Sequence, residues 1–158
     1  MNDLKCKNLS MTFTNPQTGA AVEALKDINF TLKKGELLSV LGPSGCGKTT
    51  LLNMIAGFIN PTAGEIFLGG KNIDGPGVER GMVFQQGALF EWLTVSENVS
   101  YGLRMKKTEK KESQRLVEKW LDSVRLKGFD NTTIYHLSGG IQQRVALARC
   151  LVKAREVI

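Results

Sequence analysis

Two runs near the N-terminus alternate apolar and polar positions and predict β-strands. They cover residues 4–13 (LKCKNLSMTF) and residues 22–32 (VEALKDINFTL), and the turn-forming cluster TNPQTG lies between them at residues 14–19. Two alternating runs around such a cluster are typical of an antiparallel pair. We therefore expect an antiparallel β layer at the start of the chain.

The pattern then changes to continuous apolar runs. LLSVL at residues 37–41 predicts a strand buried on both faces, and TTLLNMIAGF at residues 49–58 predicts an apolar helix. EIFL at residues 65–68 and GMVFQ at residues 81–85 predict two further short strands, joined by a glycine-rich connection at residues 69–77. Strands that alternate with helices indicate an α/β architecture.

From Thr94 to about Lys127 the chain has the pattern of helices. The charged stretch KKTEKKE at residues 106–112 is typical of a solvated helix or linker face. A stripe of apolar side chains follows at helical spacing, and we expect it to belong to a core rather than to a ligand site: Leu116, Trp120, Leu121 and Val124.

The last stretch of the chain, residues 138–158, begins as a capped helix. Ser138 is a natural N-cap, and the two glycines after it leave backbone N–H groups accessible at the start of the helix. Apolar residues then recur in a 4-3-4 pattern that predicts one buried face: Ile141, Val145, Ala148 and Val152. Val157 and Ile158 have the pattern of a strand that is beginning.

Composition limits the class of protein but indicates no particular function. With 158 residues, 42% apolar and 23% charged, the chain is typical of one soluble globular core. The net charge of +6 would suit anionic ligands or a membrane surface, but we favour a solvated lysine-rich face as its explanation. Cys6, Cys46 and Cys150 lack the spacing of a zinc site or a disulfide framework. We expect neither a secretory leader nor a membrane-spanning segment.

GPSGCGKT at residues 42–49 matches the phosphate-binding pattern G-x-x-x-x-G-K-[ST]. Its glycines let the backbone approach phosphate oxygens, and successive N–H groups form an anion nest at a helix N-terminus. Lys48 can reach terminal phosphates, and the Thr49 hydroxyl suits Mg²⁺, which takes few protein ligands. The loop follows a predicted strand and precedes a predicted helix, as this motif requires. We therefore predict nucleoside triphosphate binding.

A second motif, LSGGIQQR at residues 137–144, narrows the family. With its phosphate loop and this second motif, the sequence resembles the ATP-binding subunits of ABC transporters. LSGGIQQR resembles their signature motif, and VFQ at residues 83–85 resembles their Q-loop. Residues 51–85 are especially similar to importer ATPases of the taurine/nitrate/sulfonate class. The histidine before the signature, His136, matches no catalytic position of that family.

The resemblance implies an α/β fold. It consists of a P-loop NTPase (RecA-like) core with an N-terminal antiparallel β layer and an inserted helical subdomain, incomplete at the C-terminus. Within a single partial nucleotide-binding domain (1–158), it divides the chain into three parts. These are a β layer with the phosphate-loop core (about 1–85), the Q-loop and helical subdomain (about 86–140), and the signature helix (about 138–158).

The resemblance also assigns roles to residues. Phe13 matches the aromatic residue that stacks on adenine, with Phe in place of the commoner Tyr, although a β-layer core position also explains it. Gln85 matches the catalytic glutamine that senses Mg²⁺ and the attacking water, and Gln86 beside it leaves the register open. Thr49 matches the other metal ligand. The cradle for ATP comprises Gly42, Pro43, Ser44, Gly45, Cys46, Gly47, Lys48, Thr49 and Thr50, and the contacts to the partner's γ-phosphate are Ser138, Gly139 and Gly140.

Such subunits form head-to-tail dimers with two nucleotides between them. The resemblance implies a second copy of the chain as partner, an integral-membrane permease, and indirectly a substrate-binding protein, with no nucleic acid. It implies a cytoplasmic location at the inner face of the cell membrane, where ATP hydrolysis would power import of a small anionic solute.

One expected feature is missing from the sequence. P-loop hydrolases need a carboxylate that organises Mg²⁺, and in this family it follows an apolar strand as Asp-Glu. No such run occurs here, so we expect the chain to be cut short just before that strand. It would then bind ATP weakly and hardly hydrolyse it. Two alternatives stay open: a soluble ABC-type ATPase without a permease, and a non-catalytic nucleotide-binding fragment.

Overall fold

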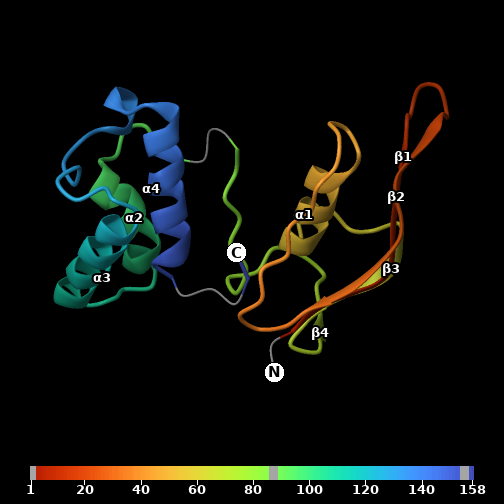
Figure 1. Cartoon of the computed structure of the whole chain (residues 1–158), viewed down its shortest axis with the longest axis horizontal. Helices are drawn as coiled ribbons and strands as arrows, with labels where there is room; N and C mark the ends of the chain where they lie inside the picture. Colours follow the sequence, from red (N-terminus) through yellow and green to blue (C-terminus); the bar gives the residue numbers. More distant parts are fainter. Residues whose placement is uncertain (1–2, 86–88, 154–156) are drawn as a thin grey trace. The chain divides into compact units, whose positions relative to one another are not determined.

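The computed structural model describes residues 3–85, 89–153 and 157–158. The chain divides into two compact units (Figure 1). The first unit comprises Met1–Arg80 together with Val157, and the second comprises Gly81–Glu156 together with Ile158. Gln86 and residues 154–156 of the predicted signature-helix part (about 138–158) lie outside the described residues.

A four-stranded antiparallel sheet in the order β2-β1-β3-β4 forms the first unit. Its strands are β1 (Leu4–Thr14), β2 (Ala21–Leu32), β3 (Ala63–Leu68) and β4 (Lys71–Asn72). β1 and β2 pair antiparallel, which confirms the predicted layer. The predicted turn between them is confirmed too, and in it Asn15 Oδ1 accepts hydrogen bonds from the N–H groups of Gln17 and Thr18. The predicted strand at residues 65–68 is also confirmed as part of β3.

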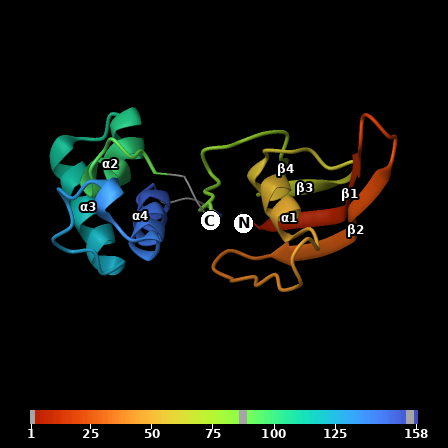
Figure 2. The same ribbon diagram turned by 90° about the horizontal axis from the view of Figure 1, so that it is seen from above.

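Helix α1 (Lys48–Ala56) covers one face of this sheet (Figure 2). Its buried side chains, Leu51 and Met54, pack on the buried residues of the sheet, whose inward positions in β1 change from even to odd at the register shift between Cys6 and Leu9. Those residues are Leu4, Cys6, Leu9, Met11, Ile66 and Leu68. The helix ends at Gly57, whose φ of 81° is the left-handed conformation that favours glycine. The predicted apolar helix is therefore confirmed.

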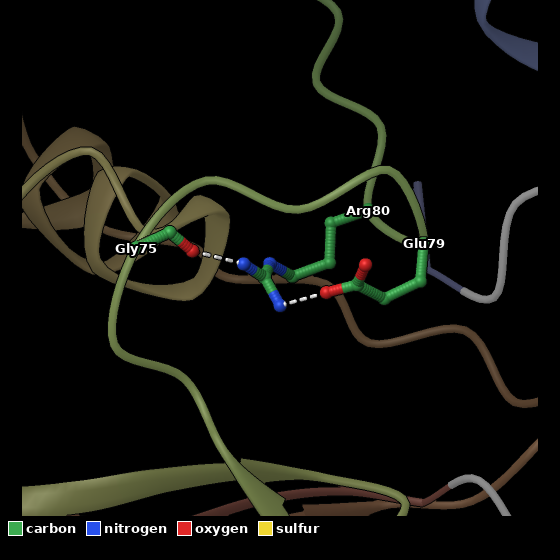
Figure 3. A network of polar contacts seen from close by, with 3 residues as sticks. All are labelled: Gly75, Glu79 and Arg80. Carbon is green, nitrogen blue, oxygen red and sulfur yellow. Dashed lines mark hydrogen bonds and ion pairs between the residues drawn. The ribbon is translucent and has the colours of Figure 1, made fainter.

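A buried arginine holds the connection that follows β4 (Figure 3). The guanidinium of Arg80 donates to the Gly75 carbonyl and pairs with the Glu79 carboxylate, and the Arg80 side chain is only 7% exposed. The connection also approaches the end of α1, where a Cβ on Gly57 would lie 2.1 Å from the Gly75 oxygen. These contacts fix the chain just before the point where the first unit ends.

Two predicted strands are wrong. Residues 37–41, all of which the structure describes, form no strand, and Leu37 and Leu41 are more than 90% exposed. Residues 81–85 form no strand either. A central parallel strand needs backbone partners on its edges, and among the described residues neither segment has a neighbouring strand. The described parallel pairing is a single bridge between Arg80 and Val157, in which the Val157 N–H donates to the Glu79 carbonyl at 3.3 Å.

Helices form the second unit: α2 (Val95–Met105), α3 (Lys110–Ser123), the short 3₁₀ helix η1 (Ile134–His136) and α4 (Gly139–Leu151). They enclose one apolar core (Figure 1). Both predicted stripes contribute to it. Val145, Ala148 and Val152 are buried with Ile141 packed against them, and Leu121 is buried with Leu116, Trp120 and Val124 packed against it. Among the described residues, no helix combines the length and the apolar character needed to cross a membrane.

Candidate functional site

The phosphate loop leads directly into α1. Gly45 and Gly47 have φ values of 82° and 92°, so both need the left-handed conformation. At Gly47 a Cβ would also lie 2.5 Å from the Ala24 carbonyl oxygen of β2. Gly47 is the N-cap and has no side chain to accept from the first-turn N–H groups. The start of α1 therefore keeps backbone donors and the positive end of the helix dipole for an anion.

Lys48 folds back over its own loop. Its Nζ donates to the carbonyl oxygens of Gly42 at 2.9 Å and Pro43 at 2.6 Å, and lies 3.5 Å from Cys46 Sγ. Carbonyl oxygens of residues 42 and 43 thus hold the ammonium against its own loop. A phosphate that entered could accept hydrogen bonds from the same ammonium.

The remaining loop residues carry hydroxyl groups or a thiol. Ser44 and Thr49 are exposed, Thr50 is half-buried, and the Thr49 hydroxyl has no hydrogen-bond partner among the described residues. A free hydroxyl oxygen is a ligand that Mg²⁺ accepts when phosphates and water complete its shell. The cysteines differ. Burial raises the pKa of Cys6 to about 11, whereas Cys46 is exposed in the loop.

Phe13 lies near the end of β1 and is 45% exposed. Alternation places it on the same face as Leu9 and Met11, beyond the part of the sheet that α1 covers. Its cross-strand partner is Val22, which is 64% exposed. The pair forms an exposed apolar surface across β1 and β2. The Ala24 carbonyl of β2 also lies close to Gly47, and this surface and the phosphate loop belong to the same unit.

A second accessible helix N-terminus lies in the other unit. Ser138 occupies the predicted N-cap position of α4 in an extended conformation, but its side chain makes no capping hydrogen bond. Gly139 and Gly140 are exposed, and a Cβ on either would contact nothing within 4 Å. Neither glycine has a positive φ. Glycine weakens a helix, yet nothing in the described part of the chain requires glycine at these two positions.

Gln85 lies beside this helix. Its carbonyl accepts from Nε2 of Gln143 on α4 at 3.4 Å. Both glutamines line an open groove of about 480 Å³, together with Gly139 and Gly140. The structure therefore brings Gln85 and the start of α4 into one unit, and the phosphate loop and Phe13 into the other.

Two polar residues to which the sequence assigned no role help to build this region. Nε2 of Gln142 donates to the carbonyls of Ile134 and Leu137, each at 3.1 Å, and so fixes η1 against α4. Asn98, fully buried in α2, bonds the backbone of residues 90–94. A polar residue on an otherwise apolar helix face is the signal that could have identified Asn98.

Comparisons with known proteins agree with this picture. Residues 25–158 match the ABC transporter family. The chain is 66% identical, over its whole length, to the taurine import ATP-binding protein TauB of Pelagibacter ubique, and it spans 59% of that relative. It is 47% identical to an uncharacterized ABC transporter ATP-binding protein, MJ0412, of Methanocaldococcus jannaschii, covering 98% of this chain and 57% of the relative. It thus spans less than two thirds of the curated relatives.

Solved structures extend the likeness to the fold. The ATP-binding cassette MJ0796, in a dimeric post-hydrolysis state bound to ADP and phosphate, superposes with a TM-score of 0.84. The sequences are 34% identical, and the match covers 96% of this chain and 70% of the cassette. The predicted α/β P-loop fold is confirmed by this similarity. With its phosphate loop, its signature-like helix and these matches, the chain is a member of the ABC transporter family.

Proposed function

We propose that this chain binds ATP with Mg²⁺ and forms part of the ATPase subunit of an importer. The observation that carries the proposal is the loop at residues 42–47, whose glycines keep the first-turn N–H groups of α1 accessible beside the Lys48 ammonium. These groups suit the β- and γ-phosphates of a nucleoside triphosphate.

The chain's own residues would act as follows. First-turn N–H groups of α1 and Lys48 Nζ bind phosphate oxygens, and the ammonium exchanges its contacts with the Gly42 and Pro43 carbonyls for them. The Thr49 hydroxyl would serve as a ligand for Mg²⁺, and the Gln85 side chain is the second ligand that the family resemblance assigns. The bound ion would supply charge neutralisation at the phosphates. By the same resemblance, Gln85 would also orient the attacking water. The Phe13 ring stacks on the adenine.

We further propose that two copies of the chain associate head to tail. The phosphate loop and the start of α4 are two separate anion-binding helix ends, each with accessible donors. Gly139 and Gly140 have open space around them, so a γ-phosphate held by a partner could approach the backbone closely. In a symmetric pair, the start of α4 in each copy would contact the nucleotide bound at the phosphate loop of the other copy. The dimeric cassettes among the solved relatives support this arrangement.

The transported solute is proposed from the relatives alone. Relatives at 66% and 58% identity are named taurine import ATP-binding proteins, so we propose taurine, or a related sulfonate or nitrate, as the solute. Import requires an integral-membrane permease, fed by a substrate-binding protein. The ATPase would then lie at the cytoplasmic face of the membrane. We also propose that residues 1–158 alone hydrolyse ATP negligibly, because the sequence has no Asp-Glu after an apolar run.

Equilibrium binding of a fluorescent ATP analogue with Mg²⁺ tests the proposal. Lys48→Ala removes the ammonium that contacts the loop and should weaken binding by roughly tenfold or more, since charge-assisted hydrogen bonds are the strong ones. Lys34→Ala changes an exposed lysine in a turn of the same unit and should leave binding unchanged. Equal affinities for the unmodified chain and the Lys48 variant would refute the assignment of the phosphate site.

A further inference from the structure

The segment at residues 89–94, which begins four residues after Gln85, is fixed to α2 by one buried side chain. The Phe90 N–H donates to Asn98 Oδ1 at 2.9 Å. Nδ2 of Asn98 donates in return to the carbonyls of Phe90 and Thr94, each at 3.0 Å. Because Asn98 is fully buried, these bonds leave the backbone at Phe90 little freedom relative to α2.

The same segment also contacts α4, through an arginine. The guanidinium carbon of Arg149 lies 4.5 Å from the ring centroid of Phe90 and 6.0 Å from that of Tyr101 on α2. The two rings are themselves 4.5 Å apart. Both distances from the guanidinium to a ring are within the range of cation–π attraction. A guanidinium stacks on aromatic rings through its planar face, which suits the half-buried position of Arg149.

A second contact from α4 reaches the chain before this segment. Gln143 lies six residues, or about 9 Å along the helix, before Arg149, and it donates to the Gln85 carbonyl. One helix therefore contacts the chain at Gln85 and again at Phe90. The start of that helix carries Gly139 and Gly140.

We propose that Arg149 is a positioning residue: by stacking on Phe90 it makes the segment that follows Gln85 move together with α4. The importance of Gln85 rests on the proposed function. The contact between Arg149 and Phe90 would couple the start of α4 to Gln85. An anion bound by the partner-facing start of α4 would shift the helix and, through Arg149 and Gln143, the glutamine of its own subunit. Each nucleotide site would thereby sense the other.

Amide hydrogen exchange on the 158-residue chain without nucleotide tests the contact. Arg149→Met keeps an apolar stem but removes the cation. It should accelerate exchange at the amides of Phe90 and Leu93, which lie in the held segment, by roughly fivefold. Arg149→Lys should restore most of the protection, because an ammonium also attracts an aromatic face. A matched control, Arg144→Met, changes an exposed arginine of the same helix and should leave both amides unchanged.

Combining variants separates coupling from general stability. Phe90→Leu should accelerate exchange at least as much as Arg149→Met does, since it also removes the ring contact with Tyr101. The double variant should show no acceleration beyond that of Phe90→Leu, because the contact between Arg149 and Phe90 is already lost. Unchanged exchange in Arg149→Met, additive effects in the double variant, or equal acceleration throughout α2, α3 and α4 would overturn the proposal. The measurement uses no nucleotide, so a failure of ATP binding would refute the proposed function and leave this result unaffected.

Discussion

Replacing Asn98 with alanine tests whether one buried amide organises the helical unit. The side chain makes four hydrogen bonds to the backbone of Phe90, Leu93 and Thr94. Two of the carbonyls keep other donors, because the Phe90 oxygen also accepts from the Leu93 N–H and the Thr94 oxygen from the Asn98 N–H. The Phe90 N–H and the Leu93 carbonyl would lose their partner. At about 1–2 kcal/mol for each, the free energy of unfolding should fall by about 2–4 kcal/mol.

Urea denaturation followed by tryptophan fluorescence measures this loss. The only tryptophans in the sequence, Trp92 and Trp120, both belong to the second unit, so the signal reports on the unit that contains Asn98. With a slope of about 1 kcal/mol per molar urea, the midpoint should fall by about 2–4 M, or the folded baseline should disappear.

Two further variants sharpen the same experiment. Asn98→Asp keeps an acceptor for the Phe90 N–H but turns a buried negative charge toward carbonyl oxygens, so at neutral pH it should destabilise at least as much as alanine. Gln114→Ala removes an exposed hydrogen bond to Glu118 and should change the free energy by less than about 0.5 kcal/mol. A midpoint for Asn98→Ala that matches the Gln114 variant would refute the reasoning.

Three other outcomes are expected. Gly47→Ala should lower the melting temperature measured by circular dichroism, by several degrees, since the new Cβ would meet the Ala24 oxygen at 2.5 Å and φ is 92°; an unchanged melting temperature would contradict this close approach. The Thr94 backbone N–H donates to the Glu97 carboxylate, and this bond, followed by a side-chain hydrogen bond with Thr94, lowers the pKa of Glu97. NMR titration should therefore show a higher pKa for Glu97 in Thr94→Ala, and the stabilisation from this capping box, present above the ordinary glutamate pKa of about 4.3, should be lost as pH falls through the lowered value. Cys46, exposed in the loop, should react fast with a thiol reagent at pH 8 and more slowly with Mg-ATP present, as mass spectrometry of the labelled site would show.

Local patterns were sufficient for much of the fold. Alternation in residues 4–13 and 22–32 predicted β1 and β2, because side chains of a strand with one buried face follow a period of two. The 4-3-4 spacing after Ile141 predicted the buried face of α4 for the same kind of reason. Apolar character alone failed at LLSVL, because a run of apolar residues becomes a central strand only where other strands supply backbone partners.

The sequence by itself determined the family and the chemistry of the phosphate loop, since glycines, a lysine and a threonine at fixed spacing already define an anion cradle at a helix start. Only the tertiary structure revealed that the Lys48 ammonium rests on its own loop and that Gly47 must pass the Ala24 carbonyl. It alone also placed Arg149 on Phe90, which lies 59 residues away in sequence. The spacing of residues along the chain determines local donors and periodicity, whereas contacts between distant residues form only when the helices pack.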